Sequence, residues 1–503
     1  MNMHQDPPKI STFGALKAAG YRSRSIKDEL RDNLIVKLKA GEEVFPGVYG
    51  YEDTVIPDVE RAILSRHNMI LLGLRGQAKT RLARQMVALL DEWIPVVYGS
   101  ELQDDPFAPL SRGAVELLAQ HGDDTRIGWL HRSERYAEKL ATPDVSVADL
   151  IGDLDPIKAA NLRLSYADEK VIHFGLIPRS NRSIFVINEL PDLQARIQVA
   201  LFNILQEGDI QIRGFKLRLP LDIQFVFTAN PEDYTNRGSI VTPLKDRIES
   251  QILTHYPKTL EIGQKITQQE AHVAADAKER VHLHPVLGRL VEQIAIEARG
   301  SEFVDQKSGV SARLTISALE NLVSAAERRC LRTHSADVHA RVSDLWGVIP
   351  AITGKIELVY EGEQEGPAIV AQNLIGKAIR SQFVEYFPNP EDLRKNSKEN
   401  PYEAVIRWFG AGNKLDMLLD LGDAEYAATL QKVPGLEAIV TKYQADAQGL
   451  EKLFLMEFVL HGLAEFSLIG KTRLEKGLVF QDLMSGLLSG GFGSADEDEE
   501  EDY

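Results

Sequence analysis

The residues best suited to chemistry lie in one glycine-containing turn, where an apolar run gives way to an amphipathic segment. The run Met69–Leu72 is followed by Gly73-Leu-Arg-Gly-Gln-Ala-Lys-Thr80, and a helical pattern begins at Thr80. In such a strand–turn–helix context, successive backbone N–H groups and the helix N-terminus can surround phosphate groups. Lys79 can then contact the β- and γ-phosphates, and the Thr80 hydroxyl can hold Mg²⁺. The spacing therefore predicts a site for ATP with Mg²⁺.

One position in this loop departs from the usual pattern. Ala78 stands where a second glycine is usual, and alanine can start a helix readily as long as its φ angle is negative. We therefore expect the loop to close around phosphate with a negative φ at Ala78. The residues expected to line the nucleotide site are Gly73, Arg75, Gly76, Gln77, Ala78, Lys79, Thr80 and Arg81.

A second polar cluster follows the apolar run Ser183–Ile187, which ends in Asn188-Glu189. A carboxylate at a strand end can orient and activate the water that attacks a phosphate, and Glu189 suits this role. Asn188 stands where an aspartate commonly supports Mg²⁺. Its carbonyl can accept a hydrogen bond from a metal-bound water, but the side chain carries no charge. We therefore expect Thr80 and Asn188 to form a weaker Mg²⁺ site than a carboxylate would give.

Three further residues could complete a catalytic site for phosphate hydrolysis. Asn230 ends a third apolar run, and its amide could bond both the γ-phosphate and the attacking water. Arg247 follows a short loop and suits contact with the γ-phosphate of a neighbouring subunit. Arg313, in Ser311-Ala-Arg313, opens a helix from which it could contact phosphates. Weaker candidates for contact with the neighbour are Arg182 and Arg237.

The elements that position these residues can be read from the spacing of apolar residues. Apolar runs alternate with helical patterns from about residue 48 to 257, which is typical of a parallel sheet wrapped by helices. The predicted strands are Met69–Leu72, Ser183–Ile187 and Ile223–Thr228. The predicted helices are Thr80–Leu90 and Leu193–Gln206, followed by a β-hairpin over Ile210–Leu219. The next region reads as wholly helical, with helices over Thr259–Ala277, His284–Glu297 and Leu314–Leu331.

These patterns divide the chain into five parts. They are a helical lead-in (1–45), an α/β nucleotide-binding domain (46–257), a helical lid domain (258–350), a mostly helical C-terminal region (351–484), and a glycine- and serine-rich hinge with a disordered acidic tail (485–503). The fold class is α/β, with a helical lid and an additional mostly helical C-terminal region.

Composition restricts the partners. The 503 residues carry a net charge of −17, so the bulk attraction that dominates non-specific binding to DNA or RNA is absent. Nucleic acid is therefore an unlikely partner. A single cysteine, Cys330, fits a reducing compartment. The longest apolar runs are only strand-length, so no membrane span is expected. We expect a cytoplasmic protein.

Taken together, these elements resemble the AAA+ ATPases, specifically the clade of the magnesium chelatase I subunit and the MoxR proteins. The resemblance covers roughly residues 45–350. It makes Gly73–Thr80 the Walker A loop and Asn188-Glu189 the Walker B pair. Asn230 then becomes sensor 1, Arg247 the arginine finger and Ser311–Arg313 sensor 2. Alanine before the Lys-Thr pair looks like the MoxR variant, whereas Asn188 departs from the family's aspartate.

The resemblance implies a homo-hexameric ring that hydrolyses ATP and remodels a protein partner, often one with a von Willebrand A domain. In magnesium chelatase such a ring drives Mg²⁺ insertion into protoporphyrin IX by a separate subunit. Two alternatives remain. A nucleotide-binding assembly scaffold with little turnover is favoured by Asn188. An AAA+ transcription activator would need a Gly-Ala-Phe-Thr-Gly-Ala-like loop and a helix-turn-helix, and the sequence shows neither.

Overall fold

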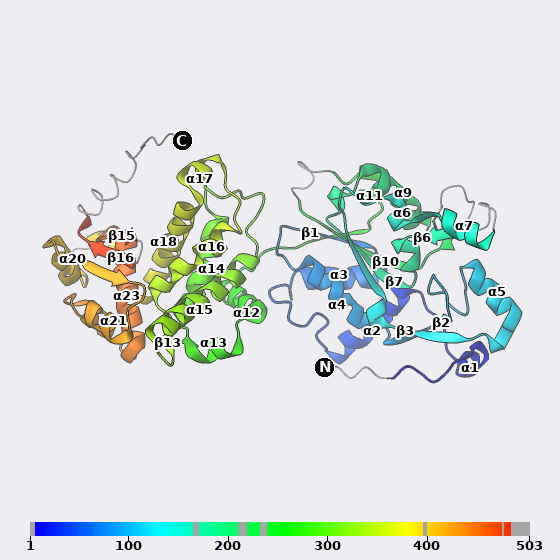
Figure 1. The fold of residues 1–503 in the computed structure, drawn as a ribbon, viewed down its shortest axis with the longest axis horizontal. Helices are drawn as coiled ribbons and strands as arrows, with labels where there is room; N and C mark the ends of the chain where they lie inside the picture. Colours follow the sequence, from blue (N-terminus) through cyan, green and yellow to red (C-terminus); the bar gives the residue numbers. More distant parts are fainter. Residues whose placement is uncertain are drawn as a thin grey trace, which may run out of the picture. The chain divides into compact units, whose positions relative to one another are not determined.

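The computed structural model describes residues 6–163, 171–207, 209–210, 219–231, 239–395, 400–474 and 477–483. The chain forms two compact units, Met1–Tyr256 and Pro257–Tyr503 (Figure 1). The first unit has two hydrophobic cores, one on each face of its sheet, and the second unit has one. Within the described residues, no helix has the length and apolar character needed to cross a membrane.

The first unit is built on a five-stranded sheet in the order β11-β1-β10-β7-β4, with every neighbouring pair parallel. Its strands are β1 (Met69–Leu72), β4 (Tyr136–Leu140), β7 (Ser183–Asn188), β10 (Ile223–Ala229) and β11 (Ser250–Leu253). The three strands predicted from apolar runs are the three central ones. Both edge strands were missed, because Tyr-Ala-Glu-Lys-Leu and Ser-Gln-Ile-Leu bury only part of their side chains and lack such a run.

Successive side chains of the central strands belong in turn to two hydrophobic cores, one on each face of the sheet. Met69 and Leu71 pack with one group of helices, whereas Ile70 and Leu72 pack with the other. This period of two places successive side chains on opposite faces, so both faces of the sheet are covered. Figure 1 shows the two layers of helices around the sheet. The helices are α2 (Ile26–Ala40), α3 (Val55–Leu64) and α4 (Lys79–Gln85) on one face, and α9 (Ala195–Glu207) and α11 (Thr242–Lys245) on the other.

The N-terminal helix α2 is fixed to the sheet by buried charges. Arg135 donates two hydrogen bonds of 2.7 Å to the carboxylate of Glu29, and both side chains are almost fully buried. Asp222, just before β10, accepts a 2.7 Å bond from the backbone N–H of Ile26. The lead-in therefore packs as part of the first unit. Ahead of it lies the short helix α1 (Phe13–Ala18).

Much of the chain between α4 and β7 forms short helices and two separate two-stranded sheets that are not part of the main sheet. An antiparallel pair, β2 (Trp93–Val97) and β3 (Ile127–His131), is joined through α5 (Arg112–His121). A second pair, β5 (Gly152–Leu154) and β6 (Ile172–Phe174), lies among α6 (Val147–Leu150), α7 (Pro156–Leu162) and α8 (Leu176–Arg179). The predicted hairpin is confirmed at its base by antiparallel β8 (Asp209–Ile210) and β9 (Leu219–Pro220). Its remaining residues lie outside the described ranges.

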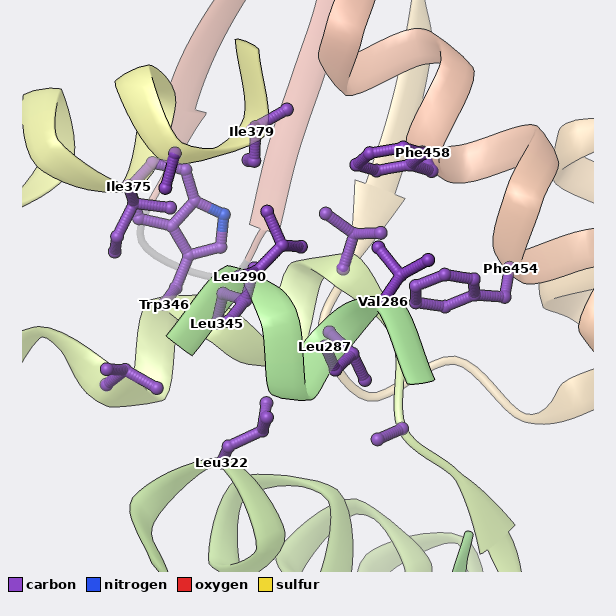
Figure 2. Packing of buried hydrophobic residues seen from close by; sticks show 14 of the residues in the cluster. Val286, Leu287, Leu290, Leu322, Leu345, Trp346, Ile375, Ile379, Phe454 and Phe458 are labelled. Atoms are coloured by element: carbon purple, nitrogen blue, oxygen red, sulfur yellow. The ribbon is translucent and has the colours of Figure 1, made fainter. Parts of the chain in front are cut away.

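The second unit is mainly helical and has one continuous core, drawn from residues on both sides of position 350 (Figure 2). In Figure 2, Val286 and Leu290 lie between Phe454 and Phe458 on one side and Trp346 on the other. Its helices include α12 (Leu260–Glu270), α13 (Ala275–Arg280), α14 (Pro285–Arg299), α15 (Arg313–Thr333), α18 (Pro367–Tyr386), α20 (Glu403–Gly410), α21 (Asp423–Leu430), α22 (Leu436–Tyr443) and α23 (Gly449–Glu465).

Two details of this unit correct the predictions, and a third adds a small sheet to the mostly helical C-terminal region. The helix expected over Thr259–Ala277 is interrupted, because the N–H of His272 leaves the helix and bonds the carboxylate of Glu320 at 2.8 Å. The region read as wholly helical also contains a parallel pair of two-residue strands, Val281–His282 and Val338–His339. The C-terminal region holds a small antiparallel sheet of Leu415–Leu418, Gly470–Leu474 and Gly477–Gln481. The acidic tail lies outside the described residues.

Candidate nucleotide-binding site

Strands β1, β10 and β7 are neighbours and parallel, so their carboxyl ends meet at one edge of the sheet. The loop Gly73–Thr80 follows β1, Asn230 follows β10, and Asn188 ends β7. Open parallel sheets bind ligands at this edge. The fold therefore brings together residues that are distant in the sequence: Lys79 and Asn230 are 151 positions apart, and Thr80 and Asn188 are 108 positions apart.

The ammonium group of Lys79 lies at the centre of this edge. It donates to the Asn230 side-chain oxygen at 2.8 Å and to the Leu74 carbonyl at 3.0 Å, and it also contacts the Gly73 carbonyl. Lys79 is the first residue of α4, so its ammonium group curls back over the loop that precedes the helix. The predicted phosphate-binding lysine and the predicted sensor asparagine are thus in direct contact.

A chain of short polar contacts links α4 to the other two strands. The Thr80 hydroxyl lies 3.5 Å from Asn188 Oδ1, at the long end of the hydrogen-bond range. Asn188 Oδ1 also accepts from the Thr228 hydroxyl at 3.1 Å, and Thr228 Oγ1 in turn accepts from the backbone N–H of Glu189 at 3.1 Å. Thr228 was not identified from the sequence, where a single hydroxyl inside an apolar run carries no obvious signal.

Two residues other than glycine have left-handed backbone at this edge. Ala78, the N-cap of α4, has φ 54° and ψ 17°, so the expectation of a negative φ there is wrong. The loop needs a left-handed turn between Gly76 (φ 72°) and the helix, which is why glycine is usual at this position. Glu189 has φ 56° and exposes its side chain beyond β7. Such strain clusters at functional sites.

The phosphate loop is held by hydrogen bonds to Tyr51 and to the residues that follow β11. The Tyr51 hydroxyl lies 3.0 Å from the Gln77 carbonyl and 2.8 Å from the His255 carbonyl. Burial raises the pKa of Tyr51 to about 12, so this hydroxyl remains a donor at neutral pH. The Gln77 side chain accepts from Thr254 at 2.7 Å, and the Tyr256 hydroxyl donates to the Arg75 carbonyl at 3.1 Å.

Gly73 is required by this close packing. A Cβ built at Gly73 would overlap the Thr254 hydroxyl and the Gln77 amide oxygen. Sequence reasoning found the loop but missed Tyr51, Thr254 and Tyr256, because their contacts with the loop span 26 to 181 positions of the chain. Of the remaining predicted loop residues, Arg75 and Gly76 are exposed, whereas Arg81 lies half-buried on the first turn of α4.

Arg247 does not join the site of its own chain. It lies between α11 and β11, and the first residue of β11 pairs with Met69 at the start of β1, whereas the phosphate loop follows the other end of β1. Its guanidinium donates to Gln206 Oε1 at 2.7 and 3.0 Å and to the Pro243 carbonyl at 2.6 Å. The side chain is thus held in place at the C-terminal end of α9.

The other arginine candidates differ from Arg247 in their burial and in their place in the fold. Arg182 is buried, with 5% of its surface exposed, and donates to the Pro95 carbonyl at 2.7 Å. It therefore has no surface with which to reach a neighbouring subunit. Arg237 lies outside the described residues. Arg313 belongs to the second unit, where it opens α15 and its backbone N–H is capped by the Ser311 hydroxyl at 3.1 Å.

The residues present suit a nucleotide with Mg²⁺. A lysine, a threonine hydroxyl, two side-chain amide oxygens and one exposed carboxylate gather around the N-terminus of a helix that follows a left-handed loop. This set offers positive charge and N–H donors for phosphate, together with oxygen ligands of the kind Mg²⁺ accepts. The sheet order and this loop define a P-loop nucleotide-binding fold of the AAA+ class.

Comparison with known proteins supports this class. The chain is 25% identical to the magnesium-chelatase 38 kDa subunit of Rhodobacter capsulatus over 243 residues, which cover 46% of this chain and 62% of that protein. It is 26% identical to the subunit of the same name from Cereibacter sphaeroides over 215 residues, covering 41% of this chain and 57% of that protein. The chain thus spans about three-fifths of these relatives' length. These similarities support the predicted resemblance to the AAA+ ATPases.

No family model matches the chain. The solved structure of NtrX from Brucella abortus in complex with ATP aligns with 58% of this chain and 52% of its own, at 14% identity and a TM-score of 0.34.

Proposed function

We propose that the chain binds ATP with Mg²⁺ at Gly73–Thr80 and hydrolyses it, as the motor subunit of a ring that acts on a partner protein. The observation that carries this proposal is the contact of Lys79 with Asn230, 2.8 Å apart, beside Thr80 and Asn188 at the carboxyl edge of the sheet. The similarity to magnesium-chelatase 38 kDa subunits supports it.

Each residue of the site would have a separate role, set by its position. Backbone N–H groups of the loop and the start of α4 would hold the phosphates, and Lys79 would contact the β- and γ-phosphates. Thr80, backed by Asn188, would hold Mg²⁺, which when bound neutralises charge on the phosphate oxygens. Asn230 would shift its amide from Lys79 towards the γ-phosphate. Glu189, exposed beyond β7, would orient the attacking water and accept its proton.

Two arginines would complete the site from elsewhere. Arg247 lies towards the opposite edge of its own sheet, so we assign it to the nucleotide of the neighbouring subunit in a homo-hexameric ring. Gln206 and Pro243 hold its guanidinium in advance, which lowers the entropy lost when it meets a phosphate. Arg313, at the start of α15, would contact the phosphates from the lid.

Nucleotide binding and hydrolysis test this proposal directly. Wild-type chain should bind ATP and release phosphate, and ATP should promote a hexamer that light scattering can measure. Lys79→Ala should lose both binding and turnover. Lys17→Ala is the matched control, because Lys17 lies on the short helix α1 and forms an exposed ion pair with Asp123, so its loss should leave both unchanged. A wild-type chain with no affinity for nucleotide would refute the proposal.

The partner can be sought with Glu189→Gln, which should bind ATP without hydrolysing it and so hold the ring on its client. Recovery of a protein with a von Willebrand A domain would support the remodelling role. Recovery of a porphyrin-binding chelatase subunit would favour a part in Mg²⁺ insertion into protoporphyrin IX. The same capture with Lys79→Ala, which cannot load ATP, supplies the background.

A second candidate function is an assembly scaffold that binds nucleotide with little turnover. The neutral Asn188 at the end of β7 favours it, because a carboxylate there would bind Mg²⁺ more strongly. Tight ATP binding and ATP-dependent ring formation, without phosphate release, would establish the scaffold and exclude the motor.

A further inference from the structure

Thr228 is one of two buried polar side chains, with Gln224, in the otherwise apolar strand β10. It lies near the end of β10, two positions before Asn230, and only 3% of its surface is exposed. Its hydroxyl contacts the end of β7 at two points: Asn188 Oδ1 at 3.1 Å and the backbone nitrogen of Glu189 at 3.1 Å. It therefore joins the strand that ends in Asn230 to the strand that ends in Asn188-Glu189.

The chemistry of these groups fixes the direction of each hydrogen bond. A backbone N–H can only donate, so Thr228 Oγ1 accepts from Glu189. The proton of the Thr228 hydroxyl then goes to Asn188 Oδ1. If the Asn188 amide were rotated by 180°, it would present an NH₂ group, which cannot accept that proton. A buried hydroxyl proton without an acceptor is unfavourable, so Thr228 selects the orientation with Oδ1 towards itself.

This orientation determines what Thr80 can offer a cation. A carbonyl oxygen accepts two hydrogen bonds, and the second acceptor site of Asn188 Oδ1 faces the Thr80 hydroxyl at 3.5 Å. When Thr80 donates its proton to Oδ1, its oxygen lone pairs remain available for Mg²⁺. A rotated amide would instead donate an N–H to Thr80 and occupy one of those lone pairs. The orientation of a neutral amide thus decides whether Thr80 is a good ligand.

We infer that Thr228 is a positioning residue for the Mg²⁺ site: it holds the Asn188 amide so that a neutral residue can orient the Thr80 hydroxyl towards the metal. This inference rests on the proposed nucleotide function. A carboxylate at position 188 has two equivalent acceptor oxygens and does not need such help. Asn188 makes the site depend on Thr228.

The test measures how much Mg²⁺ strengthens nucleotide binding, not turnover. The dissociation constant of a non-hydrolysable ATP analogue is determined in excess Mg²⁺ and in EDTA, and the ratio of the two is the Mg²⁺ enhancement. Thr228→Val keeps the shape of the side chain but removes the hydroxyl, and should lower the enhancement about 10-fold, the usual effect of losing a partner of a metal ligand. Its affinity in EDTA should stay within about 2-fold of wild type, because no phosphate contact is lost. Thr228→Ser keeps the hydroxyl and should match wild type.

Repeating the substitution in a variant with a carboxylate at position 188 tests whether the effect depends on the Asn188 amide. In N188D, the same Thr228→Val change should leave the Mg²⁺ enhancement nearly unchanged, because the carboxylate cannot be misoriented. Should the T228V chain fail to fold, Thr228→Ala takes its place with the same expectation.

An enhancement in T228V equal to that of wild type, or an equal fall in T228S and T228V, would overturn the inference alone. An equal fall in both backgrounds would do so too. A wild-type chain that binds no nucleotide in either buffer would overturn the proposed function and this inference together.

Discussion

Removing one buried hydroxyl behind the phosphate loop should weaken nucleotide binding. In Tyr51→Phe the ring keeps its place, where it is 5% exposed and packs edge-on against His255 with ring centroids 5.0 Å apart. Only the donor shared by the carbonyls of Gln77 and His255 is lost. The Gln77 carbonyl belongs to the loop itself, so the substitution loosens the loop without touching any group that meets phosphate.

The size of both effects, on stability and on nucleotide affinity, follows from the burial of the Tyr51 hydroxyl and its acceptors. Leaving a buried acceptor without its donor costs about 1–3 kcal/mol, so we expect Tyr51→Phe to lower the free energy of unfolding of the first unit by about 2 kcal/mol. If all of this cost falls on the ordered form of the loop, nucleotide affinity drops by up to about 30-fold. Because burial keeps the Tyr51 pKa near 12, the effect should be constant between pH 6 and 9.

Urea unfolding and titration with a fluorescent ATP analogue measure the two effects. Tyr402→Phe is the matched control: Tyr402 is fully buried in the second unit, and its hydroxyl donates to the Pro388 carbonyl at 2.7 Å. It should lower stability by a similar amount and leave nucleotide affinity unchanged. If Y51F bound nucleotide as tightly as wild type, or if Y402F weakened binding equally, the Tyr51 hydroxyl would not support the phosphate loop.

Three further substitutions test the site and its support. Gly73→Ala should lower nucleotide affinity at least about 10-fold in the same titration, because its Cβ overlaps Thr254, whereas Gly113→Ala, which meets open space, should not. Ala78→Gly should raise the free energy of unfolding by about 1 kcal/mol, because glycine adopts the left-handed backbone without strain, and a destabilised variant would contradict this. Burial raises the pKa of Asp222 to about 6 from 3.8, so the stability this carboxyl contributes is present below about pH 4 and lost as pH rises through 6. The stability of Asp222→Asn relative to wild type should therefore increase by up to about 3 kcal/mol between pH 4 and 7 in urea titrations, and a pH-independent difference would count against a raised pKa.

The sequence predicts the centre of this fold well because the central strands are local, continuous apolar runs. Met69–Leu72, Ser183–Asn188 and Ile223–Ala229 are buried on both faces and need no partner to be recognised. Their polar ends could be assigned to one site because parallel strands finish at one edge. The phosphate loop and Asn230 were found in this way.

The parts that were missed depend on contacts between distant segments. Tyr51 and Thr228 act through single hydroxyl groups whose partners lie elsewhere in the chain, and neither has a sequence pattern of its own. The positive φ of Ala78 was missed because the residue type argued against it, while the geometry of the loop required it. In the second unit, short strands such as Leu415–Leu418 are stabilised by their neighbours and give little periodic signal.

Arg247 offers the most direct test of the account, because it is assigned to the nucleotide of a neighbouring copy. Lys79→Ala removes a subunit's own site but leaves its Arg247, whereas Arg247→Ala leaves the site but removes the arginine supplied to the neighbour. ATP hydrolysis is measured for each variant alone and for a one-to-one mixture. We predict that each variant alone is nearly inactive and that mixing restores a substantial part of wild-type turnover. Full activity in R247A alone, or no recovery on mixing, would contradict a ring ATPase whose site is completed between subunits.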